Sequence, residues 1–213
     1  MSDIRPAGQV KEVTSLANPL IKDIRALALK KFRDRDGAFM AEGLKLVIDA
    51  LDLGWTVRTL VFARSQRGNA AIEKAAARAR AAGALVLEVP EKILTAITRR
   101  DNAQAVLGVF SQRWMPLKDI RPRDGEVWVA LDRVRDPGNL GTVIRTVDAV
   151  GAKGVILVGE TTDPYSLETV RATMGSIFAV PVARADADAF LDWRKKAAGL
   201  RLVGTHLKGS VDY

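Results

Sequence analysis

The chain has 213 residues, a hydrophobic fraction of 48% and a formal net charge of +8 at pH 7. It contains one histidine and no cysteine, which excludes a disulfide framework and a thiolate or multi-histidine metal site. No segment approaches the roughly 20 apolar residues of a membrane span, and the first residues lack the apolar region of a signal peptide, so we expect a cytoplasmic protein.

The positive charge is concentrated in the first half of the chain. Residues 1–110 carry a net charge of +6, whereas residues 111–213 carry +2. A basic surface favours a polyanionic partner, and nucleic acid is favoured over a membrane. A basic but inert surface is the alternative explanation.

Residues 1–110 are predicted to form a small α/β domain. Residues 1–12 are polar and expected to be frayed, and an amphipathic helix begins near Leu20. Apolar spacing predicts a second helix over Phe39–Leu53, and Asn69 is expected to cap an alanine-rich helix. Three short apolar runs predict strands at residues 57–62, 85–89 and 106–110, and a short helix is predicted at 91–97.

Basic side chains gather around the first predicted helix. They are expected to contact RNA phosphates, because lysine and arginine neutralise phosphate charge with release of counterions. A solvated helix face explains the same pattern nearly as well. The candidate RNA-binding residues of this region are Lys22, Arg25, Lys30, Lys31 and Arg33, together with Arg99 in a later basic loop.

Residues 111–126 carry two prolines, one glycine and many charges without a sustained period. This composition is typical of a linker between domains. We therefore predict a first domain over residues 1–110, a linker over 111–126 and a second domain over 127–213.

The second domain is predicted to begin with a βαβ unit. An apolar run at residues 127–131 predicts a strand, residues 140–150 have helical spacing, and residues 155–158 predict a second, parallel strand. Asn139 stands where a helix N-cap is expected. Because ligands of such units bind at the carboxyl ends of the strands, the candidate site residues here are Asp132, Arg133, Arg135, Asp136 and Asn139.

The remaining sequence predicts two further helices and two further strands. A helix over residues 167–174 is expected to be capped by Ser166, and a second helix is predicted at residues 188–198. Short strands are predicted at residues 180–182 and 200–204. The chain lacks a G-x-G-x-x-G fingerprint, a phosphate-binding G-x-x-x-x-G-K-[ST] loop and a G-x-S-x-G elbow, which argues against a Rossmann-type small-molecule enzyme.

The run from Leu131 to Thr146, LDRVRDPGNLGTVIRT, resembles the first signature motif of the SpoU (TrmH-type) RNA ribose 2′-O-methyltransferases of the SPOUT superfamily. The run from Arg171 to Val182 is similar to a second recurring stretch of that family. Three landmarks in the first half, at residues 18–22, 41–43 and 101–110, also resemble the family's RNA-binding domain. The resemblance covers nearly the whole chain.

This resemblance implies an α/β fold, with an N-terminal RNA-binding domain similar to a ribosomal-protein fold and a Rossmann-like SPOUT domain. Members of the family bind S-adenosylmethionine in a trefoil knot and form homodimers. The implied reaction is methyl transfer from S-adenosylmethionine to a ribose 2′-hydroxyl of RNA, with ribosomal RNA favoured over transfer RNA. No metal is implied.

Matched positions carry the expected residue roles. Arg145 matches the motif arginine that handles the ribose 2′-hydroxyl and its neighbouring phosphate, and Asn139 matches the asparagine that organises it. A guanidinium is a poor free base because its pKa exceeds about 12, so Arg145 is expected to position phosphate and hydroxyl. Arg171 is a candidate RNA contact, Thr205 a candidate cofactor contact, and His206 is expected to be structural.

One departure from the family pattern accompanies this match. The later glycine-rich G-(S/N)-E-x-x-G loop and the I-P-M segment followed by S-L-N, which build the family's cofactor site, do not occur in these 213 residues. The resemblance therefore implies an incomplete knot and no methyl transfer by these residues alone. A non-catalytic RNA-binding protein or fragment is the alternative.

Overall fold

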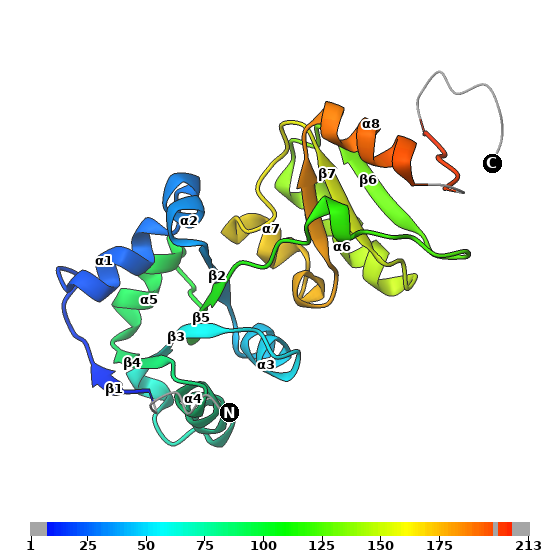
Figure 1. The fold of residues 1–213 in the computed structure, drawn as a ribbon. Helices are drawn as coiled ribbons and strands as arrows, with labels where there is room; N and C mark the ends of the chain where they lie inside the picture. Colours follow the sequence, from blue (N-terminus) through cyan, green and yellow to red (C-terminus); the bar gives the residue numbers. More distant parts are fainter. Residues whose placement is uncertain (1–7, 198–199, 206–213) are drawn as a thin grey trace.

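A five-stranded mixed sheet forms the first half of the computed structural model, which describes residues 8–197 and 200–205 (Figure 1). The strand order is β1-β4-β3-β5-β2, with β5 and β2 antiparallel to their neighbours. Its elements are β1 (Val10–Glu12), α1 (Pro19–Ala26), α2 (Lys30–Asp36), β2 (Ala38–Glu42), α3 (Leu44–Asp52), β3 (Val57–Ala63), α4 (Ala70–Ala81), β4 (Leu85–Val89), α5 (Glu91–Thr98) and β5 (Val106–Ser111).

Helices cover both faces of this sheet. Side chains of α1 and α5 pack on one face, and those of α3 and α4 pack on the other. Along each strand alternate residues join opposite clusters, as in Leu60 and Val61 of β3, because successive side chains of a strand point to opposite faces. The sheet is therefore buried on both sides, and its β2 edge faces the second half of the chain (Figure 1).

The helix predicted over Phe39–Leu53 is wrong in its first part. Residues Ala38–Glu42 form strand β2, and the helix α3 begins only at Leu44. Every residue of β2 is buried, so the strand shows no alternation of apolar and polar residues. Gly43, at φ 113°, separates the strand from the helix. The apolar residues on both sides of it have a spacing that resembles one long helix, which is why the sequence predicted one. Strand β1 was also not predicted, because its three residues are all exposed.

The second half is built on three parallel strands in the order β6-β7-β8. This confirms the predicted parallel βαβ unit. Its elements are β6 (Trp128–Asp132), α6 (Pro137–Ala149), β7 (Gly154–Val158), α7 (Leu167–Ala172), the 3₁₀ turn η3 (Ser176–Phe178), β8 (Val182–Ala185) and α8 (Ala187–Lys196). Helices α6 and α7 lie on the face that carries Val155 and Leu157, whereas α8 lies on the face of Ile156 and Val158.

The strand predicted at residues 200–204 is not present in the described part of the chain. Residues 200–205 have no regular secondary structure, and Leu202 and Val203 are 55% and 58% exposed. A strand needs a hydrogen-bonded neighbour, and no described strand pairs with this segment. The apolar run alone was therefore a misleading signal.

An aromatic cluster joins the two halves. The rings of Phe39 and Tyr165 lie 4.6 Å apart between centroids, and those of Trp55 and Phe178 lie 5.2 Å apart. Trp55 Nε1 also donates a hydrogen bond to the carbonyl oxygen of Phe178 at 2.8 Å. Tyr165 is buried, and this burial raises the pKa of its hydroxyl. The two sheets therefore share one hydrophobic core.

Two buried ion pairs lie in the same junction. Arg33 of α2 donates through Nε to Asp163 Oδ2 at 2.7 Å and through Nη1 to the carbonyl oxygen of Leu27 at 2.8 Å. Arg171 of α7 donates through Nε to Glu42 Oε2 at 2.9 Å. Because each pair joins residues about 130 positions apart, the pairs fix how the two halves sit together.

The segment 111–126 lies against the folded units. Trp114 packs edge-on against Tyr165 with ring centroids 5.1 Å apart, and its Nε1 donates to Gln112 Oε1 at 2.9 Å. Leu117–Asp119 form a 3₁₀ turn, η2, and Ile120 is buried among residues of the second sheet. Whether this segment separates two functional domains stays a prediction.

Candidate functional site

The loop after β6 has a fixed backbone conformation. Arg133 adopts a left-handed conformation with φ 51°, which is uncommon for a residue with a side chain. Its N–H donates to the carbonyl oxygen of Val158 at 3.0 Å, and Thr162 N–H donates to that of Val134 at 2.7 Å. These bonds hold the loops that follow β6 and β7 together at the carboxyl edge of the sheet.

Helix α6 begins at this loop and is capped by Asp136. The carboxylate of Asp136 accepts a hydrogen bond from Asn139 N–H at 2.6 Å, and Pro137 occupies the first helical turn. The prediction that Asn139 is the N-cap is therefore wrong, because Asp136 lies where a side-chain oxygen can reach the third residue of the helix. The side chain of Asn139 is exposed and accepts or donates no hydrogen bond to another described residue.

Arg145 projects from the exposed side of the same helix. No acidic side chain among the described residues lies within 4 Å of its guanidinium. Arg145 lines a shallow hollow of about 630 Å³ with Thr142, Thr146 and Ser176. Arg145 lies six positions after Asn139, which is about 9 Å along a helix axis. The two side chains are thus available to separate parts of one large ligand.

Close packing fixes the position of α6. A side chain at Gly141 would bring its Cβ within 2.3 Å of the Cβ of Ala172 in α7, so only glycine permits this approach. On the same side of the helix, Leu140, Ile144 and Val147 are buried in the core that both halves share. The outward direction of Arg145 is therefore set by the buried side of its own helix.

The acidic residue at the end of β6 is paired. Arg133 donates to both carboxylate oxygens of Asp132, at 2.9 and 2.8 Å. This hydrogen bonding lowers the pKa of Asp132, and both side chains are exposed. Asp132 is consequently ionised at neutral pH, which leaves it no proton to donate there as a general acid.

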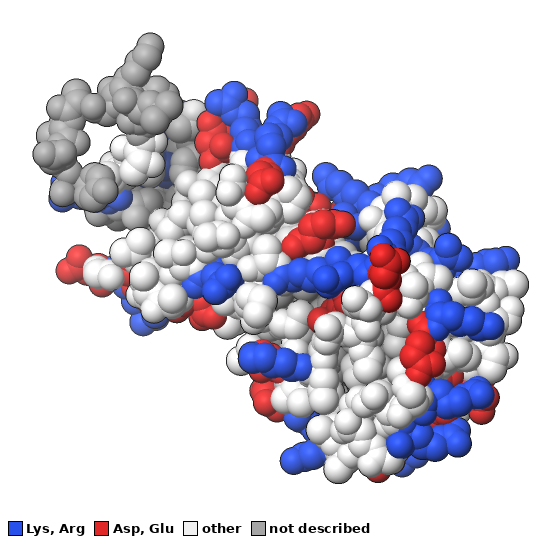
Figure 2. Space-filling model, turned by 180° about the vertical axis from the view of Figure 1, so that it is seen from behind, with Lys and Arg blue, Asp and Glu red and all other residues white. Residues whose placement is uncertain are grey.

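Most of the basic residues predicted to contact RNA lie on the surface. Their side chains are exposed on α1, on α2 and at the end of α5; they are Lys22, Arg25, Lys30, Lys31 and Arg99. Figure 2 shows basic side chains, interleaved with acidic ones, that continue from this half across the junction to the second half.

Two of the predicted RNA-binding arginines are placed differently. Arg33 is 4% exposed and enclosed by its bonds to Asp163 and to backbone oxygens, so it does not present its guanidinium on the surface. Arg171 is directed to the buried carboxylate of Glu42, which also accepts a hydrogen bond from Gln104 N–H at 2.8 Å. The structure gives both arginines a bridging place between the halves.

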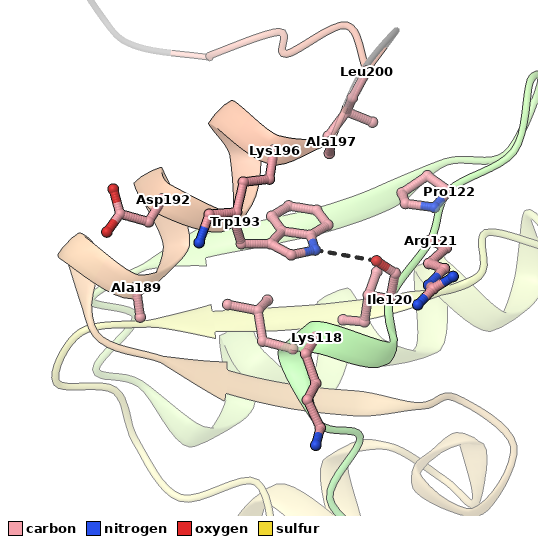
Figure 3. A pocket seen from close by; sticks show the side chains of 11 residues that line it. Lys118, Ile120, Arg121, Pro122, Ala189, Asp192, Trp193, Lys196, Ala197 and Leu200 are labelled. Atoms are coloured by element: carbon pink, nitrogen blue, oxygen red, sulfur yellow. Dashed lines mark hydrogen bonds between the residues drawn. The ribbon is translucent and has the colours of Figure 1, made fainter.

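A further pocket lies away from this edge. It has a volume of about 730 Å³ between η2 and α8, where Trp193 Nε1 donates to the carbonyl oxygen of Ile120 at 3.1 Å (Figure 3). Leu117, Pro122 and Leu200 add apolar lining. The pocket lies on the sheet face opposite α6, so it does not communicate with the loop after β6.

The predicted contact to S-adenosylmethionine does not lie in a regular element of the structure. Thr205, the predicted cofactor contact, is exposed and outside any strand. His206 lies outside the described residues. In residues 8–197 and 200–205, no helix is long and apolar enough to cross a membrane, and no three carboxylate or imidazole groups cluster as metal ligands.

Sequence reasoning missed the partners of the junction. Glu42 lay within the landmark at residues 41–43 but was not predicted to form an ion pair, and Asp163 was not singled out, because nothing local shows which of 25 acidic residues will be buried. The contact between Trp114 and Arg184 was not predicted either. The guanidinium of Arg184 lies over the Trp114 ring, 4.6 Å from the ring centroid. A signal existed only for Glu42, which stands within a buried-looking run just before Gly43.

Comparison with protein families assigns both halves. Residues 18–108 match the MRM3-like substrate binding domain, and residues 126–213 match the SpoU rRNA Methylase family. The chain is 30% identical over 204 residues to the 23S rRNA (guanosine(2553)-2′-O)-methyltransferase RlmP of Bacillus subtilis, which covers 96% of this chain and 77% of that relative. It is 31% identical to the 23S rRNA (uridine(2479)-2′-O)-methyltransferase of Streptomyces viridochromogenes, over 84% of this chain and 64% of that relative.

Solved structures show the same similarity. The crystal structure of an rRNA methyltransferase from Sinorhizobium meliloti is 65% identical in sequence and superposes with a TM-score of 0.89, over 96% of this chain and 76% of that one. The AdoMet-bound structure of the Sinorhizobium meliloti protein superposes with a TM-score of 0.88 over the same shares of the two chains. The predicted α/β fold with a SPOUT domain is thereby confirmed; the knot itself is not among the described features.

Proposed function

This chain belongs to the SpoU rRNA methylase family, and we propose that it serves the transfer of a methyl group from S-adenosylmethionine to a ribose 2′-hydroxyl of ribosomal RNA. Relatives named as 23S rRNA 2′-O-methyltransferases support the substrate, and AdoMet-bound relatives support the methyl donor. Ribosomal RNA is accordingly favoured over transfer RNA.

One observation carries the proposal. The run D-x-x-N-x-G-T-x-x-R, from Asp136 to Arg145, begins at the carboxyl edge of a parallel sheet, where α/β proteins place their chemistry, and continues along helix α6. Within this run Asn139 and Arg145 are exposed and without side-chain partners among the described residues, although α6 itself is rigidly packed. A rigid helix that presents unpaired polar groups is suited to hold a substrate in one geometry.

Arg145 acts as a positioning and electrostatic group. A guanidinium holds a phosphate through two parallel hydrogen bonds, which fixes the neighbouring ribose. It also stabilises negative charge that develops on the 2′-oxygen as the hydroxyl loses its proton. Asn139, one helical turn from the loop, adds an amide that both donates and accepts hydrogen bonds. S-adenosylmethionine supplies an electrophilic methyl group on a positively charged sulfur.

The two halves divide the work. Residues 1–110 bind RNA through the exposed lysines and arginines of α1 and α2, and residues 127–213 carry the methyl-transfer site; residues 111–126 connect them. The match of residues 18–108 to a substrate binding domain supports this division. The shared aromatic core keeps RNA-binding and catalytic surfaces in one orientation.

The assembly is a homodimer in the cytoplasm, where ribosomal RNA is accessible. The end of α6 supports a role at a subunit interface, because Val150, one helical turn after Thr146, is 71% exposed. Sedimentation equilibrium of the purified protein tests this assembly: the mass of two chains is expected, and the mass of one chain contradicts it.

The reaction is tested by transfer of tritiated methyl from S-adenosylmethionine to 23S rRNA transcribed in vitro, with enzyme expressed from its gene. A 2′-O-methyl group blocks alkaline cleavage at its nucleotide, so the label is expected in alkali-resistant dinucleotides. Label in mononucleotides would indicate methylation of a base, and the absence of label would contradict methyl transfer to this RNA. The measurement separates an enzyme from a protein that only binds RNA.

A further inference from the structure

A cleft of about 400 Å³ lies between the two halves of the molecule. It is lined from the first half by Lys30 and Asp34 of α2, and from the second half by the loop after β7 and by Arg184 of β8. Arg135, from the loop after β6, and Trp114 complete the parts of the lining that matter here. Residues of both halves therefore meet around one space.

The lining contains three cations and three carboxylates, and some of them are already in ion pairs. The cations are Lys30, Arg135 and Arg184, and the carboxylates are Asp34, Glu160 and Asp163. Asp163 is neutralised by the buried guanidinium of Arg33, which donates to it at 2.7 Å. Glu160 lies 3.4 Å from Arg135 and is 86% exposed, so this contact is weak. In the described part of the chain, Lys30 and Arg184 have no acidic oxygen within 4 Å. Asp34, the third carboxylate, has no basic side chain within 4 Å among the described residues, so the lining keeps two unpaired cations and one unpaired carboxylate.

Arg184 is held in position without losing its hydrogen-bonding capacity. Its guanidinium lies over the Trp114 ring at 4.6 Å, and Trp114 is itself fixed by its bond to Gln112. Stacking on an aromatic face leaves the N–H groups at the rim of the guanidinium free to bind an anion. The arrangement is preorganised for a group with several acceptor oxygens.

The cleft is also preformed. Its two walls are held together by the Arg33–Asp163 pair and by the aromatic cluster of Phe39, Tyr165 and Trp114. It opens at the carboxyl ends of β7 and β8, which form the same edge of the sheet as the loop that begins α6. Lys30 is exposed at the start of α2, next to the exposed Lys31.

We infer that this cleft holds a phosphate of the RNA backbone, with Lys30 and Arg184 as its ligands, where the RNA strand crosses from the first half to the methyl-transfer site. The inference rests on the proposed function and deepens it, because it names where the strand crosses. A phosphate at this place brings the nucleotides that follow it to Asn139 and Arg145. Lys30 and Arg184 thus set which nucleotide, at a fixed distance from the bound strand, reaches the site.

The test is the salt dependence of RNA binding, measured by titration of the protein into 23S rRNA transcribed in vitro at several salt concentrations. Each phosphate contact contributes about 0.7 to 0.9 to the slope of log K against log[salt]. Lys30→Ala and Arg184→Ala are each expected to lower this slope by that amount and to weaken binding about three- to tenfold. The matched controls are Lys74→Ala and Arg80→Ala on α4, which is exposed on the far side of the first half (Figure 1).

The outcomes separate the two levels of the proposal. Wild-type protein that fails to bind the RNA contradicts the proposed function and the cleft together. Wild-type binding with unchanged slopes for Lys30→Ala and Arg184→Ala overturns the cleft alone, and so does an equal loss for the α4 controls. If Arg184→Ala unfolds, Arg184→Gln keeps packing on Trp114 but removes the charge, and its slope decides the question.

Discussion

Arginines at the junction between the two halves differ from the arginine on helix α6, which follows β6, in whether an acidic side chain pairs with them. At the junction, Arg33 forms an ion pair with Asp163, and Arg171 forms one with Glu42. Both carboxylates are buried. At the edge, Arg145 is exposed and has no acidic partner among the described residues. Basic residues that look alike in the sequence thus bridge the two halves in one region and stay exposed in the other, where we propose that they bind the ligand.

Arg145→Ala is expected to have the largest effect of the substitutions that test this difference between the two regions. We expect it to lower methyl transfer to 23S rRNA by about 100-fold or more, the size typical for loss of a group that stabilises developing charge. RNA affinity should fall far less, because we propose that many other cations contact the strand. Single-turnover transfer of labelled methyl measures the rate, and Arg145→Lys, which keeps the charge but not the planar donor pair, is expected to recover part of it.

Arg171→Ala should act on stability instead. It leaves the carboxylate of Glu42, whose side chain is 1% exposed, without its main partner, and such losses cost about 3–5 kcal/mol. Urea unfolding measures the change in free energy, and Glu42→Gln combined with Arg171→Gln should be less destabilising because no unpaired charge remains. A stable Arg171→Ala protein with a smaller salt slope of RNA binding would instead make Arg171 an RNA contact, as its sequence predicted.

Trp55→Phe tests whether the hydrogen bond between Trp55 and Phe178 stabilises the junction. The change removes the donor to the buried carbonyl oxygen of Phe178 but keeps most of the ring packing. The expected loss in the free energy of unfolding is about 1–2 kcal/mol, the cost of an unsatisfied buried acceptor. A loss below about 0.3 kcal/mol in urea unfolding would show that this bond does not stabilise the junction.

Asp136→Ala tests the start of α6. It removes the carboxylate that accepts from Asn139 N–H, and loss of such a cap costs about 1 kcal/mol. Asp136→Asn retains an oxygen in the same place and is the matched control in the same unfolding measurement. Equal stability of all three proteins would contradict a capping role for Asp136.

The smallest effect concerns the pH dependence of Asp132. Its pKa is lowered by hydrogen bonding to Arg133, so the pair stabilises the folded protein above the ordinary pKa of aspartate and is lost as the pH falls through the lowered pKa. Titration of its carboxyl carbon by NMR should show a midpoint below that ordinary value. Arg133→Met should raise the midpoint; an unchanged midpoint contradicts the pairing.

The sequence predicted the elements that have local signals. The parallel strands around α6 and the caps at Asn69 and Ser166 are confirmed, because each depends on neighbours within a few residues. The helix start was placed three residues late, since Asp136 and Asn139 are both good caps and only the backbone geometry distinguishes them.

Features that depend on distant partners escaped prediction. Residues 38–42 form a strand because β5 lies beside them, and residues 200–204 form none because no described strand does. Arg33 and Arg171 were interpreted as surface cations because their acidic partners lie about 130 residues away. The resemblance identified Asn139 and Arg145 as candidates, but their exposure on a rigid helix is information that only the fold provides.

The central claim, that Arg145 serves ribose methylation of ribosomal RNA, is tested most directly by mapping 2′-O-methyl groups in ribosomal RNA from cells that lack the gene. We predict one alkali-resistant position that disappears with the gene, returns with the wild-type gene and stays absent with the Arg145→Ala gene at equal protein level. Full methylation with the Arg145→Ala gene, or an unchanged map without the gene, would contradict the account.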